Sequence, residues 1–113
     1  MKKYKPTILM DLDGVLNTYT GDYKADYIPP VKQGASKFLK TLNMNYKLVL
    51  FTTRDSDLVK HWLRDYDLSQ YFDDITNTKL PAYLIIDDRS ICFKGNYEEL
   101  LKDINNFDVW YKI

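Results

Sequence analysis

Three short apolar segments in this 113-residue chain each end abruptly in polar residues, and this pattern restricts the fold more than any other feature. We predict strands at residues 7–10, 46–53 and 82–86, with a weaker one at 72–76. Nearly continuous apolar runs of this length are typical of parallel strands that are buried on both faces. The residues at which the three runs stop are Asp11-Leu12-Asp13-Gly14, Thr52-Thr53-Arg54 and Asp87-Asp88-Arg89.

Between these strands, apolar residues recur at the spacing of helices that are apolar on one side. The pattern predicts a helix at residues 31–43 and a second one that begins after the capping residues Asp55 and Ser56. Asn96, with Glu99 three residues later, predicts the start of a third helix. Its inner face would carry Tyr97, Leu100, Leu101 and Ile104, and residues 109–111 would add an edge strand.

Strands that alternate with amphipathic helices require parallel crossovers. We therefore predict an α/β fold with a doubly wound, mainly parallel sheet and helices on both faces. A length of 113 residues with 45% apolar residues fits one domain, residues 1–113. Ligands of such sheets bind beyond the carboxyl ends of the strands, which is where the polar residues are expected.

Composition excludes several functional classes. Sixteen basic and sixteen acidic residues cancel, so the chain lacks the general attraction for nucleic acid that a basic protein has. No apolar run is long enough for a membrane helix, and the Met-Lys-Lys start lacks a signal-peptide core, so we expect a soluble, cytoplasmic protein. The single cysteine, Cys92, cannot form an intrachain disulfide and is expected to be buried, whereas His61 is expected to have a surface or packing role.

The clustered carboxylates suggest a chemistry. Asp11, Asp13, Asp87 and Asp88 are expected at the strand tips, where three carboxylates brought close together would repel one another. A cation would remove this repulsion, and Mg²⁺ suits such oxygen ligands together with phosphate. Asp11 could then attack phosphorus as a nucleophile, while Asp13 moves a proton to the leaving group and from water. Thr52 and Lys79 would supply a hydroxyl donor and a cation for the phosphoryl oxygens.

At this point the sequence resembles the haloacid dehalogenase-like (HAD) superfamily. Residues 11–16, Asp-Leu-Asp-Gly-Val-Leu, resemble its first motif, and Thr52, Lys79 and Asp87-Asp88 resemble the second, third and fourth in the expected order. The resemblance, which runs from about residue 8 to 101, implies a phosphatase that forms an aspartyl-phosphate. It also implies that Asp11 and Asp87 hold Mg²⁺ through their side chains and Asp13 through its backbone carbonyl, and that Asp88 is a second ligand or orients a metal-bound water.

Two features differ from the family pattern. Leu80 separates Lys79 from Pro81, where small relatives often have proline directly after the lysine. No segment is long enough for a large cap domain, so the tyrosine-bearing loop at residues 17–30 is the only candidate lid. Thr53, Arg54 and Arg89 are candidate substrate contacts. The substrate class stays open, with nucleic acid considered only as a phosphorylated end, and the oligomeric state is not predicted.

Other interpretations remain at this point. An inactive HAD-like binding module would keep the fold without turnover, and a receiver-like signalling domain also uses acids, Mg²⁺, Thr and Lys, although in another order. A lone Asp-x-Asp-Gly also occurs in turns and calcium loops. Single residues have structural alternatives: Thr52 as a strand-end hydroxyl, Lys79 as a solvated lysine and Asp88 as a cap or a partner of Arg89.

Overall fold

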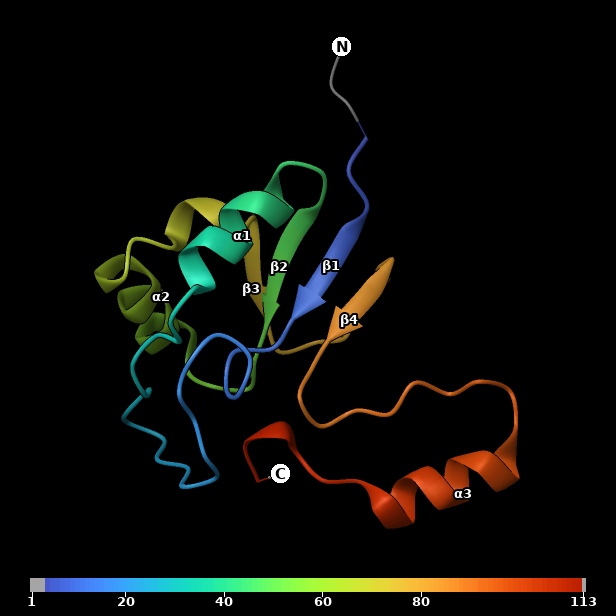
Figure 1. Cartoon of the computed structure of the whole chain (residues 1–113). Helices are drawn as coiled ribbons and strands as arrows, with labels where there is room; N and C mark the ends of the chain where they lie inside the picture. Colours follow the sequence, from blue (N-terminus) through green and yellow to red (C-terminus); the bar gives the residue numbers. More distant parts are fainter. Residues whose placement is uncertain (1–3, 113) are drawn as a thin grey trace.

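The middle of the molecule is a pair of parallel apolar strands, β1 (Thr7–Met10) and β2 (Lys47–Phe51). In the computed structural model, which describes residues 4–112, β3 (Asp74–Thr76) pairs with β2 and β4 (Leu84–Ile86) pairs with β1. The described part of the chain thus forms one parallel sheet in the order β3-β2-β1-β4 (Figure 1). This order places β1, which leads into Asp11, next to β4, which leads into Asp87.

The predicted α/β class with a parallel sheet is confirmed, and the bounds of β1 are those predicted. The other three strands are shorter than predicted. Beyond the paired residues, single backbone hydrogen bonds still join neighbouring strands. The amides of Asp73, Tyr83 and Thr52 donate to Leu48, Thr7 and Thr76 respectively, just outside the strands.

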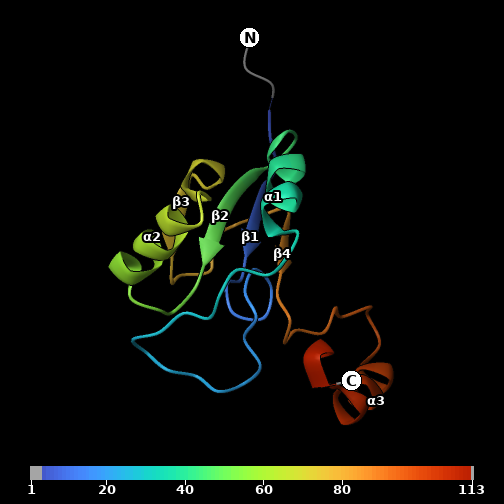
Figure 2. The ribbon, with the colours of Figure 1, turned by 60° about the vertical axis from the view of Figure 1, so that its left-hand side comes forward.

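Two helices, α1 (Ala35–Asn43) and α2 (Ser56–Asp65), lie on one face of the sheet (Figure 2). Apolar burial holds them there, because a single core joins alternate strand residues to the inner faces of both helices. Its members include Ile8, Met10, Leu48, Leu50, Leu39, Val59, Trp62 and Leu63. As predicted, the Asp55 side chain caps α2 by accepting a hydrogen bond from the Leu58 amide.

Helix α1 begins four residues later than the predicted start at Val31. Val31 instead forms an antiparallel bridge with Asn17, and the Lys32 amide donates to the Leu16 carbonyl. Gly34 then takes a left-handed conformation at φ 90°, which ends the extended segment before the helix. The backbone contacts of Val31 and Lys32 with residues 16 and 17 therefore keep the first turn of the predicted helix from forming.

The opposite face of the sheet is covered in a different way from the helix layer that we expected. Because β3 and β4 are the two edges, residues 77–83 must cross the whole sheet to join them, and a right-handed crossover in this direction runs on the face opposite α1 and α2. Leu9 and Val49, which point to that face, are buried. The observed sheet therefore carries an irregular segment rather than a helix on its second side.

Helix α3 (Tyr97–Asn106) lies apart from the sheet (Figures 1 and 2). Its predicted start is confirmed, because the Asn96 side chain accepts from the Glu99 amide. Its predicted inner face is wrong in this chain: the helix buries none of its side chains, and Tyr97 is 76% exposed. The long irregular connection that follows β4 leads this helix away from the sheet.

Three smaller expectations have clear outcomes. The predicted edge strand at residues 109–111 is wrong, because Trp110–Lys112 form a 3₁₀ turn, η2, after the buried Val109. Cys92 is exposed, so the expectation that it is buried is also wrong. His61 is exposed on α2, as a surface role requires. None of the helices described is long and apolar enough to cross a membrane.

Leu39 tests the core, because it is fully buried between α1 and the sheet. We expect Leu39→Ala to lower the free energy of unfolding by about 2–5 kcal/mol, since it removes apolar contacts and leaves a cavity. Met44→Ala, at an exposed position just after the same helix, should change it by less than about 0.5 kcal/mol. Urea unfolding measures both, and equal effects would contradict the assigned core.

Candidate functional site

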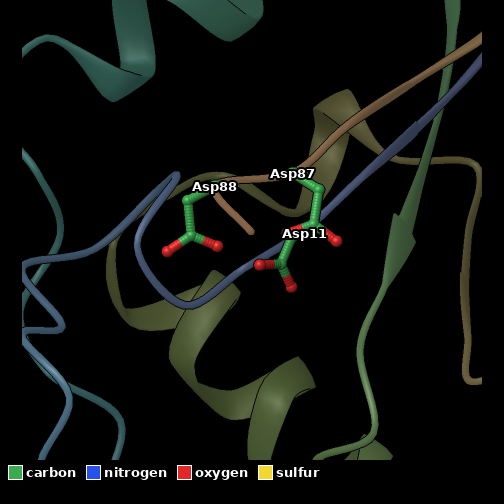
Figure 3. A group of neighbouring side chains, drawn as sticks. All are labelled: Asp11, Asp87 and Asp88. Atoms are coloured by element: carbon green, nitrogen blue, oxygen red, sulfur yellow. The ribbon is translucent and has the colours of Figure 1, made fainter. Parts of the chain in front are cut away.

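Three carboxylates meet at the carboxyl ends of β1 and β4 (Figure 3). Asp11 directly follows β1, while Asp87 and Asp88 directly follow β4. One carboxylate oxygen from each lies within 4.8 Å of the others. The sheet fixes this arrangement, because the Asp11 amide donates to the Ile86 carbonyl at 2.9 Å. The expected gathering of these acids at one edge of the sheet is therefore confirmed.

Repulsion and burial make this cluster costly without a cation. Burial raises the pKa of Asp11 from 3.8 to about 8, the Asp87 charge adds to this, and the Leu12 backbone amide opposes it. Burial also raises the pKa of Asp88, and so does its contact with Asp87. A positive ion among the three oxygens would oppose both shifts, because it favours the ionised form of each carboxyl group.

The loop after β1 approaches Asp88 so closely that only glycine fits at position 14. Gly14 has φ 80°, and a Cβ atom there would collide with the Asp88 carboxylate. The Asp88 Oδ2 atom is buried, and no hydrogen-bond partner for it exists among the described residues. A buried acceptor without a donor is unfavourable, and a metal ion is one ligand that would satisfy it. The residues present therefore fit an oxygen-preferring cation such as Mg²⁺.

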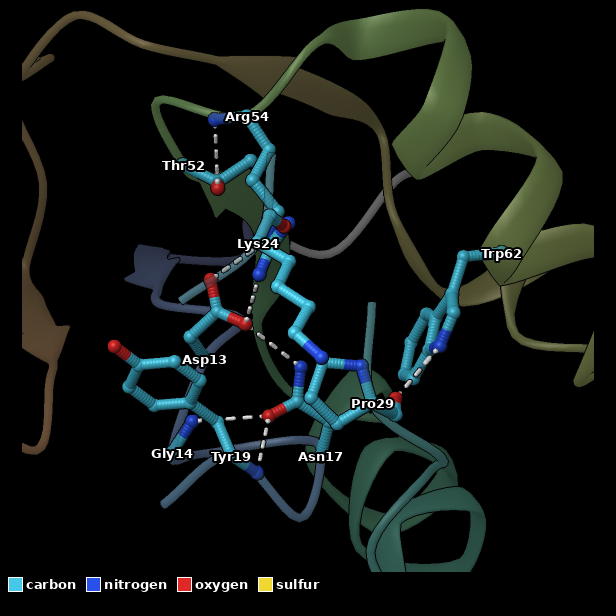
Figure 4. Close-up of polar contacts among 9 residues, drawn as sticks. All are labelled: Asp13, Gly14, Asn17, Tyr19, Lys24, Pro29, Thr52, Arg54 and Trp62. Carbon is cyan, nitrogen blue, oxygen red and sulfur yellow. Dashed lines mark hydrogen bonds and ion pairs between the residues drawn. The ribbon is translucent and has the colours of Figure 1, made fainter. Parts of the chain in front are cut away.

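Asp13 lies beside this cluster and is held by other side chains (Figure 4). Its carboxylate accepts hydrogen bonds from Arg54 Nε at 2.7 Å and Arg54 Nη2 at 3.2 Å, a two-point ion pair. Asn17 Nδ2 donates to it as well, at 3.0 Å. Paired guanidinium and carboxylate groups of this geometry are strongly oriented. The side chain of Asp13 is therefore fixed in position at the edge of the cluster.

Asn17 is a site residue that sequence reasoning missed. It is fully buried, and its Oδ1 atom accepts from the amides of Gly14 and Tyr19, both at 3.1 Å. Together with its bond to Asp13, these contacts fold the loop that follows β1. Its position three residues after an Asp-x-Asp-Gly turn was a usable signal, because asparagine side chains commonly bond to nearby backbone in turns.

Arg54 was predicted to be a substrate contact, but the structure places it inside. Its side chain is only 1% exposed. Besides Asp13, it reaches residues 17–30, which we call the flap: Nη1 donates to the Lys24 carbonyl at 2.8 Å, and the guanidinium lies 4.6 Å from the centre of the Tyr23 ring. Trp62 of α2 adds a bond from its indole N–H to the Pro29 carbonyl. The flap is thus ordered against the helix layer.

The remaining predicted site residues separate into two groups. Thr53 and Arg89 line the same hollow as the carboxylates. Thr52 is buried, its hydroxyl oxygen accepts from the Arg54 amide at 3.2 Å, and it lines a neighbouring hollow instead. Lys79 is exposed in the crossover segment and is not among the residues that line the carboxylate hollow.

The end of the described chain returns to the same loop. The Trp110 indole N–H donates to the Gly14 carbonyl at 2.7 Å, although the two residues are 96 positions apart. Tyr111 packs edge-on against Tyr19, and burial together with Tyr111 raises the pKa of Tyr19. No local pattern could have predicted these contacts, because they depend on the path of the whole chain.

These elements enclose an open hollow of about 290 Å³. It is lined by the three clustered carboxylates, by Asp13, Thr53 and Arg89, and by Tyr19 and Tyr23 of the flap. A cluster of acids at its base with an arginine and phenols at its rim can hold a cation and an oxygen-rich ligand together.

Comparisons with known proteins identify a fold and no family. No protein-family model matches the chain. No curated protein matches it either. A solved structure of a conserved protein from Bacteroides thetaiotaomicron is similar, with a TM-score of 0.61 and 23% sequence identity over 90% of this chain and 91% of the other. At this identity the likeness concerns the fold alone, and that fold is shared over almost the whole length of both proteins.

The pH dependence of the stability of the folded protein tests whether Asp11 lies in a crowded acidic cluster. The pKa of Asp11 is higher in the folded metal-free protein, about 8, than its ordinary value of 3.8. The folded state therefore binds the proton more tightly, and the stability that this contributes is lost as pH rises from about 4 to 8. In EDTA, we expect the melting temperature of the wild type, relative to Asp11→Asn, to fall by several degrees over this range.

Circular dichroism melts of both proteins at each pH provide the measurement. The subtraction removes groups that titrate elsewhere, because asparagine cannot ionise. A difference that stays flat from pH 4 to pH 8 would show that Asp11 does not lie in a crowded acidic cluster.

The Arg54 contacts generate a separate prediction. Arg54→Lys keeps the charge but loses the two-point geometry, so we expect the free energy of unfolding to fall by about 1–3 kcal/mol. Arg64→Lys, at an exposed position in the last turn of α2, is the matched control and should change it by less than about 0.5 kcal/mol. Urea unfolding of both variants decides, and equal losses would contradict the buried role.

Proposed function

We propose that this protein is a Mg²⁺-dependent phosphomonoester hydrolase in which Asp11 is the nucleophile. The observation that carries the proposal is the convergence of Asp11, Asp87 and Asp88 within 4.8 Å at the carboxyl ends of two adjacent parallel strands. Acids crowded in this way favour a hard cation, and the ligands of such folds bind at this edge of the sheet. The order of the sequence motifs supports the same chemistry.

Asp11, Asp87 and Asp88 would hold the metal, with Asp88 Oδ2 as the buried acceptor in need of a partner. When bound, Mg²⁺ supplies positive charge that lets Asp11 remain ionised and that neutralises the phosphate oxygens. Without it, burial and the neighbouring acids keep a proton on Asp11 up to about pH 8. Ionised Asp11 is the form that can attack.

In the proposed reaction, an Asp11 carboxylate oxygen forms a bond to phosphorus, and the bond from phosphorus to the ester oxygen breaks. The leaving oxygen takes a proton from Asp13. Water then attacks the aspartyl-phosphate at phosphorus, gives a proton back to Asp13, and releases phosphate and free Asp11. Atoms and protons balance over this cycle, and no redox step is needed.

Asp13 must loosen some of its contacts to carry a proton, because Arg54 and Asn17 donate three hydrogen bonds to its two oxygens. The same contacts keep it aimed at the hollow beside Asp11. We therefore assign Arg54 and Asn17 as positioning residues for Asp13, and not as groups that touch the substrate. In the proposed site, Thr53 and Arg89 at the rim are placed to bind phosphate oxygens.

The alternative function is an HAD-like module that binds Mg²⁺ and phosphate without turnover. The tight hold of Arg54 on Asp13 is the observation that favours it, since an acid that stays fully engaged transfers no proton. Such a module would bind vanadate or phosphate in a Mg²⁺-dependent manner and would leave an aryl phosphate intact.

An activity assay with para-nitrophenyl phosphate tests the proposal. We expect Asp11→Asn to lower kcat by several orders of magnitude, because it removes the nucleophile. Asp65→Asn, an exposed position at the end of α2, is the control and should keep full activity. EDTA should stop the wild-type reaction, and added Mg²⁺ should restore it.

Hydrolysis by folded Asp11→Asn at the wild-type rate would refute the nucleophile assignment, and turnover in EDTA would refute the metal requirement. The same pair of proteins then serves a substrate screen of nucleotides, sugar phosphates, phosphorylated polynucleotide ends and phosphopeptides, with Asp11→Asn as the blank.

A further inference from the structure

Helix α3 carries an apolar face that nothing in the described chain covers. Tyr97, Leu101 and Ile104 lie on one side of the helix at helical spacing, and they are 76%, 63% and 54% exposed. Phe93 before the helix and Phe107 after it are exposed as well. Amphipathic helices of soluble proteins normally bury this stripe, so a contiguous exposed one marks an interaction surface.

The edge strand β4 also exposes apolar side chains on both faces of the sheet, and we call this exposed edge the β4 surface. Leu84 and Ile85 point to opposite faces of the sheet, and each is 38% exposed. Tyr83, just before the strand, is 66% exposed. In a layered α/β domain, an apolar strand at this position is covered by a helix. The exposed apolar face of α3 and the exposed apolar edge at β4 could therefore each cover the other.

The size of the chain shows how much surface is left open. A folded monomer of 13.4 kDa has an accessible surface of roughly 6,500 Å², whereas this chain has 8096 Å². Its radius of gyration is 15.2 Å, against about 13 Å for a compact domain of this length. Helix α3, which projects from the body in Figures 1 and 2, contributes to this expansion.

The segments on either side of α3 place it away from its own β4. After the helix, Val109 is buried and Trp110 donates to the Gly14 carbonyl, which fixes the C-terminal end below the loop that follows β1. Before the helix, residues 87–96 form an extended connection that carries it outward. The helix thus presents its apolar face to solvent, where a second molecule can reach it.

We propose that α3 docks on the β4 surface of a second copy of this chain, in a symmetric dimer in which each copy covers the other. A two-fold arrangement of one helix and one strand surface per chain closes on itself and leaves neither exposed. Burial of the excess of roughly 1,600 Å² on each chain gives about 3,200 Å² in total, within the range of stable homodimers. This inference is independent of the proposed phosphatase activity.

A membrane surface fits this helix less well. Tyr97–Asn106 contains Glu98, Glu99 and Asp103 against a single Lys102, so its polar face is acidic. Interfacial helices instead carry lysine and arginine, which are attracted to anionic lipids. Charge therefore favours a protein partner.

Sedimentation equilibrium of the full chain measures the assembly. We expect a mass of twice 13.4 kDa for the wild type, and of one chain for the double variant Leu101→Asp with Ile104→Asp. Lys102→Asp, on the opposite side of α3, changes the net charge by the same two units and should stay dimeric. A monomeric wild type, a dimeric double variant or a monomeric control would each overturn the proposal, as would binding of monomers to phosphatidylglycerol vesicles.

Cross-linking identifies the docked surfaces without a disruptive charge. In a Cys92→Ser background, chains with Leu84→Cys and chains with Leu101→Cys are mixed and oxidised. We expect a disulfide-linked pair that joins one chain of each kind, in excess over pairs of identical chains. An absence of mixed pairs would overturn the assigned surfaces, and so would an intrachain disulfide as the main product when both cysteines are placed in one chain.

Discussion

The pairing of β1 with β4 is the interaction on which the site depends. Each strand alone ends in ordinary acidic residues, but their parallel register forces Asp11 against Asp87 and Asp88. The apolar burial of β1 between its neighbours supplies the stability that holds these like charges together, since Leu9 and Met10 are fully buried. The fold thus concentrates negative charge where the geometry of a parallel sheet leaves an opening for ligands.

Much of this architecture was predictable from local patterns. Apolar runs identified the strands, and helical spacing with capping residues such as Asp55 and Asn96 identified the starts of α2 and α3. The gathering of Asp11 with Asp87 followed from topology alone, because the carboxyl ends of parallel strands share an edge. These features are encoded within short windows of sequence, where spacing and residue type decide the outcome.

What could not be predicted depends on contacts between distant residues. Arg54 was a candidate substrate contact because it follows a strand end, yet it is buried, and its guanidinium donates to Asp13 and to the Lys24 carbonyl. The stripe of α3 has the spacing of a buried helix, and only the path of residues 87–96 shows that its own sheet does not receive it. The residue type shows that a side chain can form an ion pair or an apolar contact, whereas the path of the whole chain determines which partner lies beside it.

The guanidinium of Arg54 donates hydrogen bonds both to Asp13 and to the backbone of the flap, so the positions of these two groups depend on each other. A movement of Arg54 that breaks its bonds to Asp13 would also weaken its bond to the Lys24 carbonyl. Loosening of the Asp13 carboxylate and loosening of the flap would therefore be linked, and each would favour the other by the same free energy. One buried side chain thus couples the freedom of the Asp13 carboxylate to the order of the flap.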